Sequence, residues 1–213
     1  MCYTCMKKNS VTSKIKGSIK PIFLKSFRDR VQVDLIDFSR LRKCDPFGVS
    51  MRWVMTLKDH TTRLTHICAL PRKQAHLIAY KLQDIFGFIG YPKIFHTNNG
   101  KEFTANCVLQ FLHNLNPNIV SVTGRPRCPH DQGSVENVNK IVKRILGTLL
   151  VERRLACHNP NWTELLGSVA AAINLQCGQY KNDVSAYEAV YGDKFDHPIC
   201  LAQRLRHTGA GCL

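Results

Sequence analysis

Three polar positions, far apart in the chain, could perform phosphoryl-transfer chemistry. Asp34 lies in the run VDLIDF, Asn98 in FHTNNGKEF and Glu136 in PHDQGSVEN. Two-metal nucleotidyl transfer needs carboxylates that hold two divalent cations about 3.5–4 Å apart, beside the attacking and leaving oxygens. Asp34 and Glu136 are therefore candidate ligands for Mg²⁺ or Mn²⁺, which prefer oxygen donors. The middle position is a neutral amide, and this difference decides whether an enzyme is expected.

Hydrophobic patterning predicts the elements that carry these three positions. The β-branched run Val31–Phe38 is typical of a buried strand, and it places the first acid on the face opposite the apolar side chains. A short strand at Pro92–Phe95 ends just before the amide, at the strand end where ligands gather in open α/β sheets. An amphipathic helix from Gln132 to about Arg154 begins beside Glu136.

The rest of the pattern predicts a mixed α/β fold. Three further strands and three further helices are predicted at Arg52–Leu57, Leu64–Leu70, Ile119–Val122, Lys73–Phe86, Phe103–Leu115 and Trp162–Leu175. Pro46–Gly48 marks a turn, and Asn161 can cap the last helix. The segment from Asp183 to Leu213 is weakly patterned. Early strands followed by alternating helices and strands describe a mixed sheet covered by helices.

The charge balance points to a polyanionic partner. The chain of 213 residues holds 30 Lys and Arg against 15 Asp and Glu, a formal net charge of +15. Nucleic acid is the leading partner for such a chain, and an anionic membrane surface is the second. The N-terminal stretch has no apolar run suited to a signal peptide or a membrane span. Ten cysteines without a secretory signal indicate reduced thiols in the cytosol or nucleus.

Basic residues gather around the third acid. Lys140 and Lys143 stand at i+4 and i+7 from Glu136, on the same helical face. The candidate DNA-backbone contacts are Arg125, Arg127, Lys140, Lys143 and Arg144. An ordinary solvated pair between Glu136 and Lys140, on a basic solvated face, is the alternative interpretation. Spacing alone favours the solvated pair.

Four segments, in order, resemble the motifs of the catalytic core of retroviral and retrotransposon integrases. The strand Val33–Asp37 resembles the first-acid strand of that family. Phe95–Phe103 resembles its second-acid segment, usually H-S-D-N-G-x-E-F. Gly124–Glu136 resembles the third-acid loop and helix, usually R-x-x-H-P-Q-S-Q-G-x-x-E, and Ser185–Gly192 resembles the downstream S-P-Y-E-x-x-F-G box. The sequence of these motifs is most similar to domesticated, transposon-derived integrase-like regions of vertebrate proteins with KRAB or SCAN domains.

The resemblance implies a ribonuclease-H-like fold, with a mixed five-stranded sheet flanked by helices, and a division of the chain. Residues 1–30 form a basic lead-in with a remnant Cys2-x-x-Cys5 of a zinc module, for which no zinc binding is expected without the other ligands. Residues 31–192 form the core-like domain, and residues 193–213 form a tail. Cys128 and His130 are expected to belong to a plain loop.

One departure from the family pattern carries the functional prediction. The second acid of the family maps onto Asn98, a poorer ligand for a hard cation than a carboxylate. The site then lacks a full negative charge between two dications, so strand transfer is expected to fall by several orders of magnitude. Cys128 and His130 also replace the usual His and Gln of the third-acid loop. The catalytic function is expected to be lost.

Three functions follow as alternatives. The first is an inactive, transposon-derived integrase-like domain that binds DNA in the nucleus. The second is an active two-metal integrase or nuclease that tolerates Asn98 or uses Asp37 or Glu102 instead. The third is a protein-interaction or dimerisation module without DNA contact, since integrase cores self-associate. A homodimer is expected, and neither a membrane nor a small-molecule substrate is.

Overall fold

A five-stranded mixed sheet forms the centre of the protein. The computed structural model describes residues 26–98, 100–124, 133–156, 160–176 and 184–192. The sheet has the order β5-β4-β1-β6-β7. Its strands are β1 (Arg30–Asp37), β4 (Trp53–Asp59), β5 (Thr65–Leu70), β6 (Ile94–Thr97) and β7 (Val120–Thr123). β4 runs antiparallel to β1 and β5, whereas β6 runs parallel to β1 and β7. The predicted fold class is confirmed.

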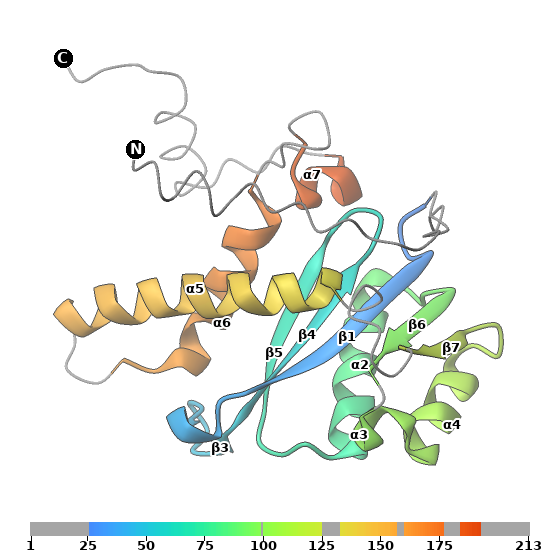
Figure 1. The fold of residues 1–213 in the computed structure, drawn as a ribbon, viewed down its shortest axis with the longest axis horizontal. Helices are drawn as coiled ribbons and strands as arrows, with labels where there is room; N and C mark the ends of the chain where they lie inside the picture. Colours follow the sequence, from blue (N-terminus) through green and yellow to red (C-terminus); the bar gives the residue numbers. More distant parts are fainter. Residues whose placement is uncertain (1–25, 99, 125–132, 157–159, 177–183, 193–213) are drawn as a thin grey trace, which may run out of the picture.

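Helices cover both faces of this sheet (Figure 1). On one face α2 (Ala75–Ile89) and α4 (Asn106–Leu115) pack against Val31 and Val33 of β1. On the other, α5 (Gly133–Ala156) and α6 (Trp162–Asn174) pack against Ile36. Because side chains alternate along a strand, Asp34 shares the face of Ile36, opposite the two valines, as the pattern predicted. The acid therefore points toward α5.

Two helix boundaries differ from the predicted ones by three residues, whereas the other helix and strand ends agree within one or two. The helix expected at Phe103–Leu115 is divided into α3 (Lys101–Thr104) and α4, because Ala105 adopts an extended backbone. The helix expected to end at Phe86 continues through Gly87 and ends at Gly90, whose φ is +79°. A glycine can sit inside a helix when packing holds it, so the first glycine does not stop the chain.

The weakly patterned C-terminal segment contains a helix that periodicity missed. α7 (Ala186–Tyr191) has only 6 residues, too few to show an amphipathic repeat. The Ser185 hydroxyl accepts a hydrogen bond from the Glu188 amide at 3.0 Å and caps this helix. Gly192 ends it with a φ of +80°. This helix lies within the segment that resembles the downstream integrase box.

A small insertion lies between β1 and β4. It consists of the 3-10 turn η1 (Ser39–Leu41) and the hairpin strands β2 (Lys43–Cys44) and β3 (Ser50–Met51). The predicted turn at Pro46–Gly48 connects the two strands. The Asp45 carboxylate accepts hydrogen bonds from the amides of Phe47 and Val49, at 3.0 and 2.8 Å, and so fixes the turn.

No helix in the described part of the chain is long and apolar enough to span a membrane. Several predictions fall outside the described residues: the Cys2–Cys5 pair, the tail 193–213, Arg125 and Arg127, and the loop positions Cys128 and His130. The division of the chain into three parts therefore stays a prediction.

Candidate nucleotidyl-transfer site

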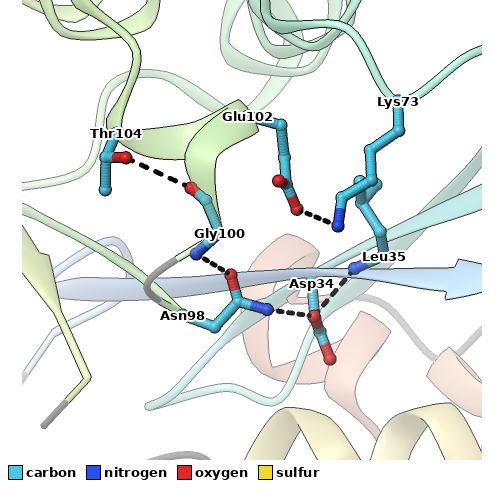
Figure 2. A network of polar contacts seen from close by, with 7 residues as sticks. All are labelled: Asp34, Leu35, Lys73, Asn98, Gly100, Glu102 and Thr104. Carbon is cyan, nitrogen blue, oxygen red and sulfur yellow. Dashed lines mark hydrogen bonds and ion pairs between the residues drawn. The ribbon is translucent and has the colours of Figure 1, made fainter. Parts of the chain in front are cut away.

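The sheet brings the first and second predicted site positions into contact. β1 and β6 are parallel neighbours, paired from Arg30 with Ile94 to Val33 with Thr97. Asp34 and Asn98 continue this register by one residue. The Asn98 side-chain amide donates a hydrogen bond from Nδ2 to Oδ1 of Asp34 at 3.0 Å (Figure 2).

A second contact fixes which end of the Asn98 amide faces the acid. Oδ1 of Asn98 accepts a hydrogen bond from the Gly100 backbone N–H at 2.9 Å. A rotated amide would set its NH₂ against that N–H and its oxygen against the carboxylate, so both contacts would be lost. Asn98 therefore presents a donor, and not an oxygen ligand, to Asp34.

A third residue, Asn139, completes the site, and the sequence pattern did not identify it. Its Nδ2 donates to Oδ2 of Asp34 at 2.7 Å, and its Oδ1 accepts from the Thr56 hydroxyl at 2.8 Å. The signal was present, since Asn139 is a polar residue beside the buried Val138 and Val142 of the α5 stripe. A polar group in such a position needs a buried partner.

Both oxygens of the Asp34 carboxylate thus accept hydrogen bonds from the protein. Oδ1 also accepts from the Leu35 backbone N–H at 2.9 Å. The bonds connect β1, β4, α5 and the segment after β6 through one half-buried acid. Neutral donors thus occupy three of the roughly four lone-pair sites of this carboxylate.

Burial and the negative charges of two other acids raise the pKa of Asp34. Burial is the largest cause of a raised Asp34 pKa, hydrogen bonds from Leu35 and Asn139 oppose the increase, and the negative charges of Glu136 and Glu102 add to it. Glu136 is exposed on α5. Glu102 is buried, and its Oε1 forms an ion pair with Lys73 Nζ at 2.9 Å (Figure 2).

The segment between the amide and this ion pair is tightly packed. A Cβ atom on Gly100 would collide with the Glu102 carboxylate and would lie 2.8 Å from Oδ1 of Asn98. Only glycine fits this close approach without displacing its neighbours. A glycine at position 100 therefore allows the backbone N–H to approach Oδ1 of Asn98.

These residues do not fit a pair of bound metal ions. Among the described residues there is no group of three or more His, Cys, Asp or Glu side chains that could hold a metal. The side-chain oxygen of Asn98 accepts a hydrogen bond from the Gly100 N–H, and the carboxylate oxygens of Asp34 accept hydrogen bonds from neutral donors. The donor set is that of a hydrogen-bonded polar cluster.

Basic side chains lie near the start of α5. Lys140, Lys143 and Arg144 are exposed on this helix, whereas Arg125 and Arg127 lie outside the described residues. The sequence pattern missed Lys58 of β4, whose Nζ donates to the Ser134 carbonyl oxygen at 3.5 Å. Burial, with a smaller contribution from the Arg63 charge, lowers the pKa of Lys58 to about 8.

Histidine adds little positive charge to the same region. Burial lowers the pKa of His60 to about 4, and the positive charges of Arg30 and Lys58 add to this effect. His60 is therefore neutral at pH 7, and its Nε2 lies 2.9 Å from Oε1 of Gln32. Among the described residues, the positive charge beside the site therefore comes from lysine and arginine.

Comparison with known sequences gives relatives of two kinds. No family model matches the chain. KRAB-A domain-containing protein 2 from Homo sapiens is 28% identical over 210 residues, which cover 99% of this chain and 40% of the relative. The Gag-Pol polyprotein of baboon endogenous virus (strain M7) is 26% identical over 161 residues, covering 74% of this chain and 8% of the relative. The Pol polyprotein of feline endogenous virus ECE1 is 24% identical over 161 residues, covering 74% of this chain and 14% of the relative. The chain thus spans less than half the length of these relatives.

Comparison with solved structures identifies the fold. The HTLV-2 integrase catalytic core domain in complex with magnesium, in a trimeric form, superposes with a TM-score of 0.58 at 14% identity, over 77% of this chain and 97% of that one. A simian T-cell lymphotropic virus intasome, in complex with PP2A regulatory subunit B56 gamma, gives 0.66 at 19% identity, over 92% of this chain and 65% of that one. The chain has the fold of the retroviral integrase catalytic core, and its sequence is similar to a KRAB-A domain-containing protein and to retroviral Pol polyproteins.

Proposed function

We propose that this domain binds DNA but does not catalyse DNA strand transfer. The observation that carries the second half of the proposal is the pair of amide donors on Asp34. Two-metal catalysis requires carboxylate oxygens that are available to cations, which stabilise the charge developing in the transition state. Here Asn98 and Asn139 donate one hydrogen bond to each oxygen of that acid.

The nearby acids Glu102 and Asp37 do not replace the carboxylate that is missing at position 98. The Glu102 carboxylate is buried and paired with Lys73. Asp37 is exposed, stands three positions after Asp34 and so points to the opposite face of β1, and accepts a hydrogen bond from the Ser39 amide at 2.7 Å. These arrangements disfavour the alternative of an active enzyme with a substituted acid.

A strand-transfer assay tests the catalytic half. DNA strand transfer and nicking are measured with Mg²⁺ and with Mn²⁺ for the unmodified chain, Asn98→Asp, Glu136→Gln and the double variant. The unmodified chain is expected to give no product above the metal-free background. Any product that Asn98→Asp restores is expected to disappear when Glu136→Gln is added. Metal-dependent product from the unmodified chain that Glu136→Gln abolishes would contradict the proposal.

DNA binding is supported by the net charge of +15 and by the exposed cations of α5, Lys140, Lys143 and Arg144. Contacts of this kind neutralise phosphates without reading sequence, so the affinity falls with salt at a log–log slope of about −0.9 per phosphate. A nuclear location is part of the same proposal.

A salt titration of duplex DNA binding measures this interaction. Lys140→Gln is expected to reduce the magnitude of the slope by about one and to weaken binding to unrelated duplexes equally. Arg72→Gln is the matched control, since Arg72 is exposed just before α2, which covers the opposite sheet face. Absence of binding at low salt, or equal slopes for the two variants, would refute DNA binding through α5.

Self-association is a second candidate, favoured by large exposed side chains. Tyr80 and Phe88 of α2 are exposed, and Tyr91 follows them. The similar HTLV-2 integrase core is described as trimeric. Sedimentation velocity of the DNA-free chain distinguishes a monomer from the homodimer expected from the sequence.

A further inference from the structure

A groove runs along the second half of α5, away from the Asp34 cluster. It consists of two adjoining cavities of about 630 and 430 Å³. Both cavities are lined by Arg40 and Leu41 of η1 on one side and by Gly147 and Leu150 of α5 on the other. The insertion between β1 and β4 thus forms one wall, and α5 forms the other.

The α5 wall has an ordered arrangement of side chains. Lys143, Gly147, Leu150, Val151 and Arg154 all line the groove. They stand at i, i+4, i+7, i+8 and i+11, so they share one helical face. With a rise of about 1.5 Å per residue, the two cations are about 16 Å apart along the axis. The groove is therefore apolar in the middle and basic at both ends.

The opposite wall is held in place by contacts with α6. Nε1 of Trp162 donates to the Leu41 carbonyl oxygen at 2.6 Å, and Nδ2 of Asn161 donates to the Cys44 carbonyl oxygen at 2.6 Å. The rings of Phe38 and Trp162 pack with centroids 5.0 Å apart. A wall fixed in this way needs little reordering when a ligand binds, which favours affinity.

The basic lining of the groove favours an acidic ligand. Besides the two α5 cations, Arg40, Arg42 and Lys43 line the groove, against a single acid, Asp37. Residues 1–25 hold six lysines and no acid, and the whole chain carries +15. Neither the N-terminal segment nor a second copy of the chain therefore complements this surface.

The apolar part of the groove favours protein over nucleic acid. Nucleic acids bind by stacking bases on open aromatic faces, but Phe38 and Trp162 are only 8% and 1% exposed. The exposed apolar surface is aliphatic instead, with Leu41 58% and Val151 62% exposed. Aliphatic side chains of a partner would remove this surface from water.

We propose that the groove binds an acidic, amphipathic segment of a partner protein. Its apolar side chains pack on Leu41, Leu150 and Val151, and its carboxylates pair with Arg40 and Arg154. This is the helix-in-groove mode of peptide recognition, with acidic residues at both ends of an apolar stripe. Lys143 lines this groove and also belongs to the cations proposed to bind DNA, so the test uses Gly147, which is not one of those cations.

Gly147 allows a test that blocks the groove without weakening the fold. A Cβ atom at this position meets no atom within 4 Å, so Gly147→Leu projects its side chain into open groove and raises the helix propensity of α5. Gly167→Leu is the matched control, because Gly167 is exposed in α6, its Cβ position is equally open, and it does not line the groove. Thermal melts check that both variants fold.

Fluorescence anisotropy measures binding of a labelled synthetic peptide of about 15 residues, or about four helical turns. Its leucines stand at i, i+4, i+7 and i+11, and glutamates flank them. The controls are a scrambled peptide of the same composition and a labelled DNA duplex. We expect Gly147→Leu to weaken binding of the patterned peptide at least tenfold, and Gly167→Leu to change it less than twofold. The scrambled peptide is expected to bind at least tenfold more weakly.

Other results overturn the proposal. These are no binding of the patterned peptide, equal binding of both peptides, or equal effects of the two glycine substitutions. A loss of duplex DNA affinity on Gly147→Leu as large as the loss for the peptide would assign the groove to nucleic acid. Methyl NMR gives an independent check, since the patterned peptide should shift the signals of Leu41, Leu150 and Val151 and leave the buried Leu82 unchanged.

Discussion

Asn98→Asp is expected to destabilise the metal-free domain by about 2–4 kcal/mol. The substitution removes the hydrogen bond to Asp34 and sets two carboxylates within about 3 Å of each other, near the charge of Glu102. The Gly100 N–H still finds an acceptor, so the loss falls on the contact with Asp34. Two adjacent acids share a proton, and their raised pKa makes the variant more stable as the pH falls.

A divalent cation is expected to reverse this effect in the variant alone. Binding to the folded form stabilises it by about 2.7 kcal/mol when the free ion is at 100 times its dissociation constant. Thermal unfolding is measured with and without Mn²⁺ or Mg²⁺ for the unmodified chain and for Asn98→Asp. The melting temperature of the unmodified chain should change little, because its Asp34 oxygens already accept hydrogen bonds.

The control is Asn106→Asp, the same chemical change at an exposed position in the first turn of α4. It should alter stability by less than about 0.5 kcal/mol and give no response to metal. An equal rise in melting temperature for the unmodified chain and for Asn98→Asp would show that the amide does not prevent metal binding. That result would contradict the proposal that the site is catalytically inactive.

The sheet was predictable because local patterns specify it. β-branched runs mark β1, and the alternation of its side chains puts Asp34 on the face away from Val31 and Val33. The position of Asn98 followed from the strand that precedes it. Both predictions depend only on short-range periodicity and on the rule that ligands gather at strand ends.

The contacts that decide the chemistry were not predictable in this way. The orientation of Asn98 depends on the Gly100 N–H, and Asn139 reaches Asp34 across 105 residues of sequence. The groove wall depends on Trp162 and Leu41, which are 121 residues apart. Periodicity contains no information about such pairings, since they arise only when α5 and α6 pack on the sheet.

Asn139→Ala is expected to destabilise the domain by about 2–4 kcal/mol, although alanine is the better helix former. The change removes the donor to Oδ2 of Asp34, and it leaves the Thr56 hydroxyl with only the longer bond to the Asp34 carbonyl oxygen, at 3.4 Å. Thr56 is fully buried, and a half-buried carboxylate without one of its donors costs more than a neutral group would. Asn137→Ala is the control, because Asn137 is exposed on the same helix.

A double-mutant cycle in chemical denaturation separates this bond from other effects. Asn139→Ala and Asp34→Ala should show a coupling of about 1.5–3 kcal/mol, because the second substitution removes the carboxylate that the first leaves without a donor. Energies that add within about 0.5 kcal/mol would mean that the two residues do not interact. A coupling of the expected size would establish that the Asp34 carboxylate joins α5 to the sheet.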